Sequence, residues 1–289
     1  MTEPLLLAID VRPGRIVLAT VHRHRVIDTR RLEREGCDDA ARTAAGIALL
    51  RERAPGPIVG LAGVWRPEAR LGLADPRGFI ALLEDVGART ALPTSWLPHG
   101  AALALGEWSR SQVEGPLAAL ALDVGVAGGV VLDGRAFAPL RLDLGHVSVD
   151  PDGLKCACGG RGCLHTYASE TAMQLLARDV ESSLELPSPA DRQQVMGSHL
   201  AARQAEKVRS THVLIARAGR AMGLAAGHLA EAFGVVEVRV RGRHPDQWRV
   251  LSATAAKVAA DVYGERAPRL VAAESSEDAF FVGAVAAHS

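Results

Sequence analysis

Most of the cysteines in this chain lie in one short run whose spacing suits a metal ion. Three of the four, Cys156, Cys158 and Cys163, fall within the glycine-rich residues 156–163. Thiolates this close can converge on one tetrahedral ion, and the glycines permit the tight reversal that returns Cys163 to the other two. His146 upstream supplies a fourth ligand. The pattern predicts a closed, structural zinc site with no position left for a reacting water.

Two other interpretations of these cysteines remain open, a disulfide and reduced thiols in the core. A disulfide would use only two of the three sulfurs, and nothing in the sequence indicates an oxidising compartment. Cys37 stands alone beside polar residues, so we expect it to be a free thiol.

The composition argues against several classes of partner. The chain has 289 residues, with 33 basic and 33 acidic side chains, so net charge gives no argument for nucleic acid or an anionic membrane. Its N-terminus lacks the basic start and long apolar middle of a signal peptide, and no apolar run approaches membrane-spanning length. We therefore expect a cytoplasmic protein with neither nucleic acid nor membrane as partner. A hydrophobic fraction of 48% supports a core large enough for two lobes or one large domain.

Apolar runs and helical patterns alternate along the chain, which predicts an α/β protein. The expected strands are 5–10, 15–20, 25–30, 58–63, 89–92, 117–124, 135–137, 235–240 and 270–273. The expected helices are 39–53, 76–86, 100–108, 169–184, 211–233, 246–262 and 276–287, with a polar connection over 186–199. An apolar strand ending in an aspartate, Asp10 or Asp123, opens each half and is followed by a similar pair of turns and strands. This internal duplication of a βββαβ unit implies two similar lobes with a cleft between them.

With these features the chain resembles the ROK family, named for repressors, open reading frames and kinases. The resemblance is specific at Asp143–His146, at Cys156–His165 and at the following Ala168-Ser169, and weaker elsewhere, down to Gly283-Ala284. It implies a duplicated actin-like (ribonuclease H-like, hexokinase-type) fold and a homodimer.

The same resemblance gives the domain limits. We expect a first lobe over 1–107, with the last helix (about 276–289) packing back on it, and a second lobe over 108–275 that carries the zinc loop. It also implies structural zinc on the ligands already inferred from spacing, His146, Cys156, Cys158 and Cys163.

The family's ATP-binding and catalytic motifs are altered in this chain. The first phosphate loop, usually Asp-x-Gly-Gly-Thr-Lys, keeps Asp10 but has Arg12-Pro13 in place of the paired glycines, and proline has no N–H to offer a phosphate. The position of the catalytic aspartate, general base for the sugar hydroxyl, holds His99. A histidine can abstract a proton, but a histidine that simply begins a helix is the plainer interpretation.

The nucleotide side is altered as well. The second phosphate loop, residues 123–129, keeps Gly125, Gly128 and Gly129 but has Asp123-Val124 in place of Gly-Thr, and a new carboxylate would repel a phosphate. A glycine pair near the adenosine reads Arg241-Gly242-Arg243.

The sugar contacts implied by the resemblance are partly changed. Asp143 and His165 replace two glutamates, and His146 and Gly63 complete the expected ligand-binding residues. For His165, a surface position or a supporting place beside the metal site fits equally well.

Three functional hypotheses follow. In the first, the chain binds a sugar or sugar derivative in the cleft, with ATP-dependent kinase activity impaired or absent. In the second, it is an active ATP- and magnesium-dependent sugar kinase with His99 as general base. In the third, it is a component of a ligand-sensing regulator, although regulators of this family carry a helix-turn-helix domain before the first strand and this chain begins just before Leu5. The altered motifs favour the first, because phosphoryl transfer depends on positioning and the losses compound.

Overall fold

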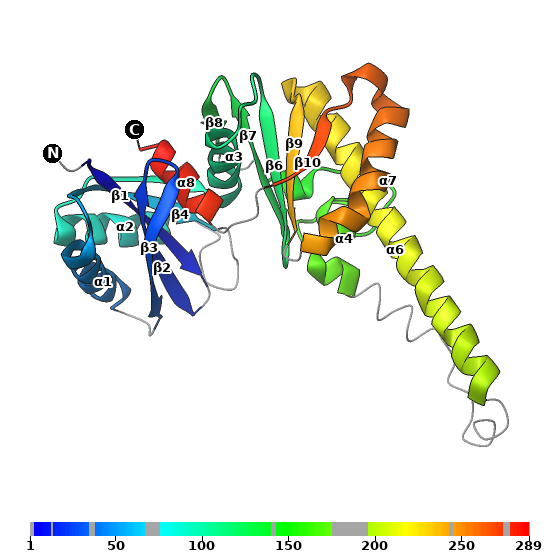
Figure 1. Ribbon diagram of the computed structural model, residues 1–289, viewed down its shortest axis with the longest axis horizontal. Coiled ribbons are helices and arrows are strands. Elements are labelled where there is room, and N and C mark those ends of the chain that lie inside the picture. Colours follow the sequence, from blue (N-terminus) through cyan, green and yellow to red (C-terminus); the bar gives the residue numbers. More distant parts are fainter. Residues whose placement is uncertain are drawn as a thin grey trace.

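The computed structural model describes residues 3–12, 14–34, 38–66, 76–139, 143–174, 196–242, 245–273 and 278–288. These residues form two five-stranded mixed sheets with helices packed around them (Figure 1). Among them, no helix combines the length and apolar character needed to cross a membrane.

The first sheet has the strand order β3-β2-β1-β4-β5. Its strands are β1 (Leu5–Arg12), β2 (Arg15–His22), β3 (Arg25–Glu33), β4 (Ile58–Trp65) and β5 (Thr94–Pro98). The first three pair antiparallel, whereas β4 is parallel to both β1 and β5. Strands β1 and β4 are almost entirely buried because helices cover the sheet, and this explains their continuous apolar sequences. Helices α1 (Asp39–Arg53) and α2 (Pro76–Thr90) provide part of that cover.

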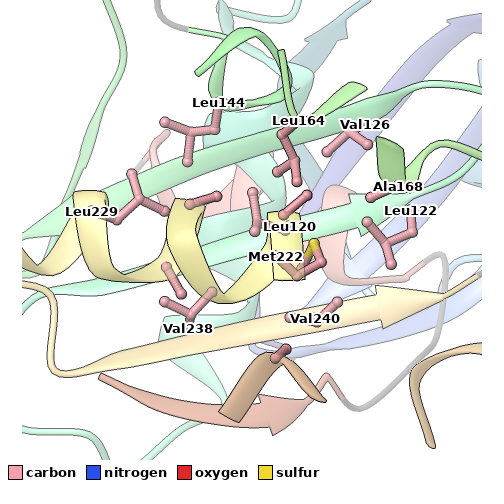
Figure 2. Close-up of a cluster of buried hydrophobic side chains, with 14 of the residues drawn as sticks. Leu120, Leu122, Val126, Leu144, Leu164, Ala168, Met222, Leu229, Val238 and Val240 are labelled. Atoms are coloured by element: carbon pink, nitrogen blue, oxygen red, sulfur yellow. The ribbon is translucent and has the colours of Figure 1, made fainter. Parts of the chain in front are cut away.

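The second sheet repeats this topology with the order β10-β9-β6-β7-β8. Its strands are β6 (Leu117–Leu122), β7 (Val126–Leu132), β8 (Arg135–Phe137), β9 (Glu237–Gly242) and β10 (Arg269–Ala272). The long helix α6 (Met196–Phe233) lies on this sheet, with Met222 and Leu229 packed over Leu120 and Val238 (Figure 2). Helix α7 (Pro245–Tyr263) packs beside α6 and against β9 and β10. The equivalent strand orders confirm the internal duplication.

Two helices connect the sheets. Helix α3 (His99–Ser109) packs on β6 and β7, while α8 (Asp278–Ala286) packs on α3 and on the strands of the first sheet (Figure 1). The two helices cross closely because each has a glycine that faces the backbone of the other. A Cβ added to Gly106 would lie 1.9 Å from the Ala279 carbonyl oxygen. A Cβ added to Gly283 would lie 1.8 Å from the Ala102 carbonyl oxygen. Phe280 and Phe281 of α8 share one core cluster with residues of both sheets.

Most of the expected elements are present, with some corrections. The strand expected at 89–92 is wrong: α2 continues to Thr90 because its buried positions Phe79, Leu83 and Val86 keep helical spacing, and the strand comes later, as β5. The helix expected at 211–233 begins at Met196, so the end of the polar connection predicted over 186–199 is helical; residues 186–195 lie outside the described residues. Residues 170–174 of the helix expected over 169–184 are helical, and the part from 175 onward is not described. Cys37, Pro13 and Arg243 also lie outside the described residues.

Candidate functional site

Charged residues from several strands meet where those strands end. Asp10 and Arg12 close β1, Arg66 directly follows β4, His99 directly follows β5, and Arg241 lies near the end of β9. Because the carboxyl ends of neighbouring parallel strands lie at one edge of a sheet, this is where α/β folds commonly bind ligands. We call these five residues, together with Phe280 of α8, the strand-end cluster.

Asp10 is the buried acidic centre of the strand-end cluster. Its carboxylate is fully buried and accepts hydrogen bonds from Arg66 Nε (2.7 Å to Oδ1), Arg66 Nη2 (2.9 Å to Oδ2) and Arg12 Nε (2.7 Å to Oδ2). Burial alone would raise the pKa of Asp10, but the charge and hydrogen bonds of Arg66, with the charge of Arg12, outweigh it and lower the pKa to about 2. Both carboxylate oxygens are thus engaged by guanidinium groups.

His99 lies beside this ion pair at the start of α3. Its ring stacks on Phe280, with 4.4 Å between ring centroids and an interplanar angle of 8°. Burial and then the positive charge of Arg66 hold the pKa of His99 well below its usual range. The imidazole is therefore neutral at pH 7, and the same burial and positive charge weaken it as a base.

The predicted metal ligands form a second group, the Cys–His cluster. The ligand atoms of His146, Cys156, Cys158 and Cys163 all lie within 4.8 Å of one another. The Cys158 and Cys163 sulfurs are 3.6 Å apart, and Cys156 Sγ lies 3.4 Å from His146 Nδ1. A tetrahedral zinc ion with bonds of about 2.3 Å to sulfur and about 2.0 Å to nitrogen would place such atoms roughly 3.5–3.8 Å apart. The donor set and its spacing fit this ion.

The backbone of the loop creates this convergence. Cys156 N donates to the Gly160 carbonyl (2.9 Å) and Gly159 N to the Cys156 carbonyl (3.0 Å), which closes the turn. Gly162 has φ +62°, and a Cβ there would lie 1.6 Å from the Asp150 carbonyl oxygen. Only glycine fits this position, where the chain turns back to deliver Cys163.

The thiols of the Cys–His cluster differ in their protonation. Burial, together with the neighbouring thiols of Cys158 and Cys156, raises the pKa of Cys163 to about 12. The Gly160 backbone lowers the pKa of the exposed Cys158. A divalent cation would hold Cys163 as a thiolate against the effect of burial, since a coordinating thiol is deprotonated.

Three predicted ligand-binding residues lie beside or within the Cys–His cluster. Asp143 Oδ2 is 3.7 Å from His146 Nε2, and Asp143 Oδ1 accepts a hydrogen bond from Gly145 N (3.0 Å). His165 packs its ring on His146, with centroids 5.6 Å apart, and its Nδ1 accepts from Val126 N (3.4 Å). A carboxylate next to a metal-binding histidine orients the ring, so Asp143 would support a metal ion held by His146.

The predicted glycines have packing roles. Gly128 and Gly129 lie within β7, where added Cβ atoms would meet backbone, including the Gly100 carbonyl oxygen at 2.3 Å. Gly63 is buried in β4, where a Cβ would lie 2.7 Å from the Phe79 ring, and a Cβ on Gly125 would lie 3.0 Å from the His165 ring. Roles of these glycines in binding phosphate or sugar stay predictions.

Two members of the strand-end cluster are new from the structure, Arg66 and Phe280. The signal for Arg66 was its position, directly after a buried strand that pairs in parallel with the strand of Asp10. Phe280 comes from a helix remote in sequence and gave no local signal.

Comparison with known proteins identifies one family and several enzymes that are similar in sequence to this chain. A sequence model of the family described as the ROK family matches residues 79–288. The glucokinase of Thermotoga maritima is 32% identical over 139 residues, which is 44% of each chain. The chain thus spans about half the length of the curated relatives it matches.

Solved structures share the fold over nearly the whole chain. A ROK-family transcriptional regulator, a homologue of the E. coli MLC protein, superposes with a TM-score of 0.75 at 21% identity, covering 98% of this chain and 77% of the other. The ROK hexokinase of Thermus thermophilus gives 0.73 at 22% identity, covering 98% and 97%. A regulator and an enzyme match equally well, so the two-lobed fold alone does not distinguish their functions.

Proposed function

Because the chain belongs to the ROK family, we propose that it binds a sugar or sugar derivative between its two lobes and that its ATP-dependent kinase activity is impaired or absent. The observation that carries this proposal is the pairing of Asp10, whose two carboxylate oxygens are both engaged by Arg66 and Arg12. Magnesium-dependent phosphoryl transfer needs carboxylate oxygens for the ion and backbone N–H groups for the phosphates. Asp10 is the carboxylate of the family motif that this chain keeps, and the guanidinium groups of Arg66 and Arg12 bind both of its oxygens.

We further propose that the Cys–His cluster holds structural zinc. Its four donors match a closed Cys3His site, which leaves no open position for catalysis. The zinc ion would hold together the segment from Asp143 to His165, whose two end residues are expected to contact the sugar.

An active sugar kinase with His99 as general base is the second candidate. Two observations favour it: the named relative is a glucokinase, and His99 directly follows β5 at the strand ends, beside Asp10 and Arg66. A neutral base at the start of α3 can take a proton from a sugar hydroxyl if a substrate oxygen comes within hydrogen-bonding distance.

Sugar-dependent release of ADP separates these candidates. We would incubate the protein with ATP, magnesium and a panel of hexoses and amino sugars, and measure ADP release alongside calorimetric binding of each sugar and of ATP. The proposal expects sugar binding without sugar-dependent ADP release. ADP release that His99→Ala abolishes would overturn it and establish the kinase. His228→Ala is the matched control, because His228 also packs against an aromatic ring, that of Tyr263.

The pH dependence of any such activity gives a further check on His99. Its lowered pKa means that the imidazole stays neutral as pH falls through 6.5, so the rate should decrease only at a pH well below that value. A half-maximal rate near pH 6.5 would contradict His99 as the base.

Two broader expectations belong with this proposal. We propose a homodimer, which the family resemblance suggests, and a cytoplasmic location, which the sequence analysis predicts. Size-exclusion chromatography with light scattering tests the first, and fractionation of the native cells tests the second.

A further inference from the structure

The strand-end cluster carries more positive than negative charge. Three guanidinium groups, those of Arg12, Arg66 and Arg241, gather there with one carboxylate, Asp10, and the His99 imidazole is neutral. The Arg12 and Arg66 side chains keep only 11% and 13% of their surface exposed. Charges held in such a place are unfavourable unless they are paired, and Arg12 and Arg66 both contact Asp10, so the guanidinium of Arg241 is the one that suits an anion.

Arg241 is the donor that lacks a protein acceptor. Its Nε is buried, with no hydrogen-bond partner in the part of the chain that the structure describes. Its guanidinium lies over the Phe280 ring, 5.5 Å from the centroid, and Arg66 lies over the same ring at 5.0 Å. A buried donor without an acceptor is uncommon in folded proteins, and an acceptor on a ligand would satisfy it.

Phe280 places guanidinium groups from both sheets at one point. Arg66 follows β4 of the first sheet, whereas Arg241 belongs to β9 of the second. The rigid ring of Phe280 holds both side chains, and His99 stacks on it as well. The donors are therefore ordered before any ligand arrives, which lowers the entropic cost of binding.

We propose that Arg66 and Arg241, with Arg12, bind the phosphoryl group of a phosphorylated sugar. This inference rests on the proposed function, because it names the class of sugar ligand. A phosphate monoester carries close to two negative charges at neutral pH, and one of its oxygens would give the buried Nε of Arg241 an acceptor. Its three terminal oxygens point in different directions and can accept from guanidinium groups of different strands, whereas a carboxylate offers two oxygens in one plane.

The phosphoryl group has three sources to compare: a sugar phosphate, free inorganic phosphate and the terminal phosphate of ATP. We would measure calorimetric titrations of the full chain with hexose and amino-sugar 6-phosphates, with the parent sugars, with inorganic phosphate and with ATP and magnesium. The sugar phosphate should bind at least about tenfold more tightly than its parent sugar and than inorganic phosphate, and its affinity should fall as salt is added.

The variant Arg241→Gln tests the assigned residue. It should weaken binding of the sugar phosphate by at least about tenfold while changing the affinity for the parent sugar by less than about twofold. The matched control is Arg217→Gln, because Arg217 also lies over an aromatic ring, Tyr167, at 5.0 Å. Arg217→Gln should leave both affinities within about twofold of the wild type. If Arg241→Gln does not fold, Arg241→Lys keeps the charge but removes the fork and should still weaken the sugar phosphate severalfold.

Each other outcome overturns the inference. Equal affinity for a sugar and its phosphate, or a substitution at Arg241 that leaves sugar-phosphate affinity unchanged, removes the phosphoryl site while leaving the proposed sugar binding intact. Tighter binding of ATP than of any sugar phosphate, weakened by Arg241→Gln, assigns the arginines to a nucleotide instead. Absence of binding by sugars and their phosphates alike, up to about 10 mM, removes both this inference and the proposed function.

Discussion

At the scale of single residues, the Asp10 ion pair is the most informative feature. The resemblance to the family's motif predicts that this aspartate lies in a phosphate loop, yet its carboxylate accepts three hydrogen bonds from Arg66 and Arg12. Removing one partner of a buried ion pair leaves an uncompensated charge, which costs more than the net contribution of the pair itself. The stability of the fold and the chemistry of the site therefore depend on the same side chains.

Replacing Asp10 with Asn should lower the free energy of unfolding by about 3 kcal/mol at pH 7, because two guanidinium groups lose their carboxylate. Chemical denaturation followed by circular dichroism measures this change. Asp85→Asn is the control, because Asp85 pairs with Arg89 at an exposed position and should cost less than about 0.5 kcal/mol.

The pH dependence of this difference has a definite sign. The pKa of Asp10 is lowered from 3.8 to about 2 in the folded state, which corresponds to about 2 kcal/mol of stability. That stability is complete above pH 3.8 and is lost as pH falls towards 2. The difference between wild type and Asp10→Asn should therefore be constant from pH 7 to pH 5 and shrink below pH 4. A difference that vanished at pH 6 would contradict the ion pair.

At the scale of elements, the loop of residues 156–163 is closed by its own backbone hydrogen bonds, and its three thiols converge as the ligands of one metal ion would. Burial keeps Cys163 protonated in the absence of a cation, whereas the Cys158 thiol is exposed. Without a metal ion the thiols make few stabilising contacts with one another. The proposed zinc should therefore contribute much of the free energy that keeps the loop folded.

Removing zinc with a strong chelator should lower the melting temperature by about 5 °C or more and weaken sugar binding in parallel. Metal analysis should find zinc in the purified protein and none after chelation. Cys163→Ala should abolish the response to chelator, whereas Cys37→Ala, outside the loop, should preserve it. An unchanged melting temperature after complete metal removal would refute the structural zinc.

The elements also show what the sequence could and could not predict. Strands that are buried on both faces, such as β1 and β6, are continuous apolar runs and were predicted within two residues. Strand β5 was misplaced because Thr94–Pro98 is short, half-exposed and flanked by prolines, while the preceding helix runs further than expected. The metal ligands were predictable because their spacing is local. The partners of Asp10 and His99 were not, because Arg66 and Phe280 are brought to them only by sheet pairing and helix packing.

At the scale of the whole molecule, the crossing of α3 and α8 joins the two lobes. Gly106 and Gly283 let each helix approach the backbone of the other, and the surrounding core includes Val64 of the first sheet, Leu117 of the second sheet and Phe281 of α8. A substitution that separates the two helices should therefore lower the stability of both lobes.

Gly106→Ala should lower the free energy of unfolding by about 2 kcal/mol or more, because its Cβ would lie 1.9 Å from the Ala279 carbonyl oxygen and backbone must move. Gly78→Ala in α2 is the control: its Cβ would meet nothing within 4 Å, so the change should be stabilising and below about 1 kcal/mol. Denaturant unfolding of both variants measures this. Equal effects of the two substitutions would show that the crossing tolerates side chains.

The position of α8 has a consequence for biosynthesis. Chains leave the ribosome from the N-terminus, and domains made first usually fold first. In this protein the core beneath the first sheet includes Phe280 and Phe281, which are translated after every strand of the second sheet. The core of the first lobe therefore cannot be completed until the second lobe has been translated. Until then the face of the first sheet that α8 covers stays exposed. Apolar surface exposed during that interval is prone to aggregation, so we expect truncation before α8 to make the chain insoluble.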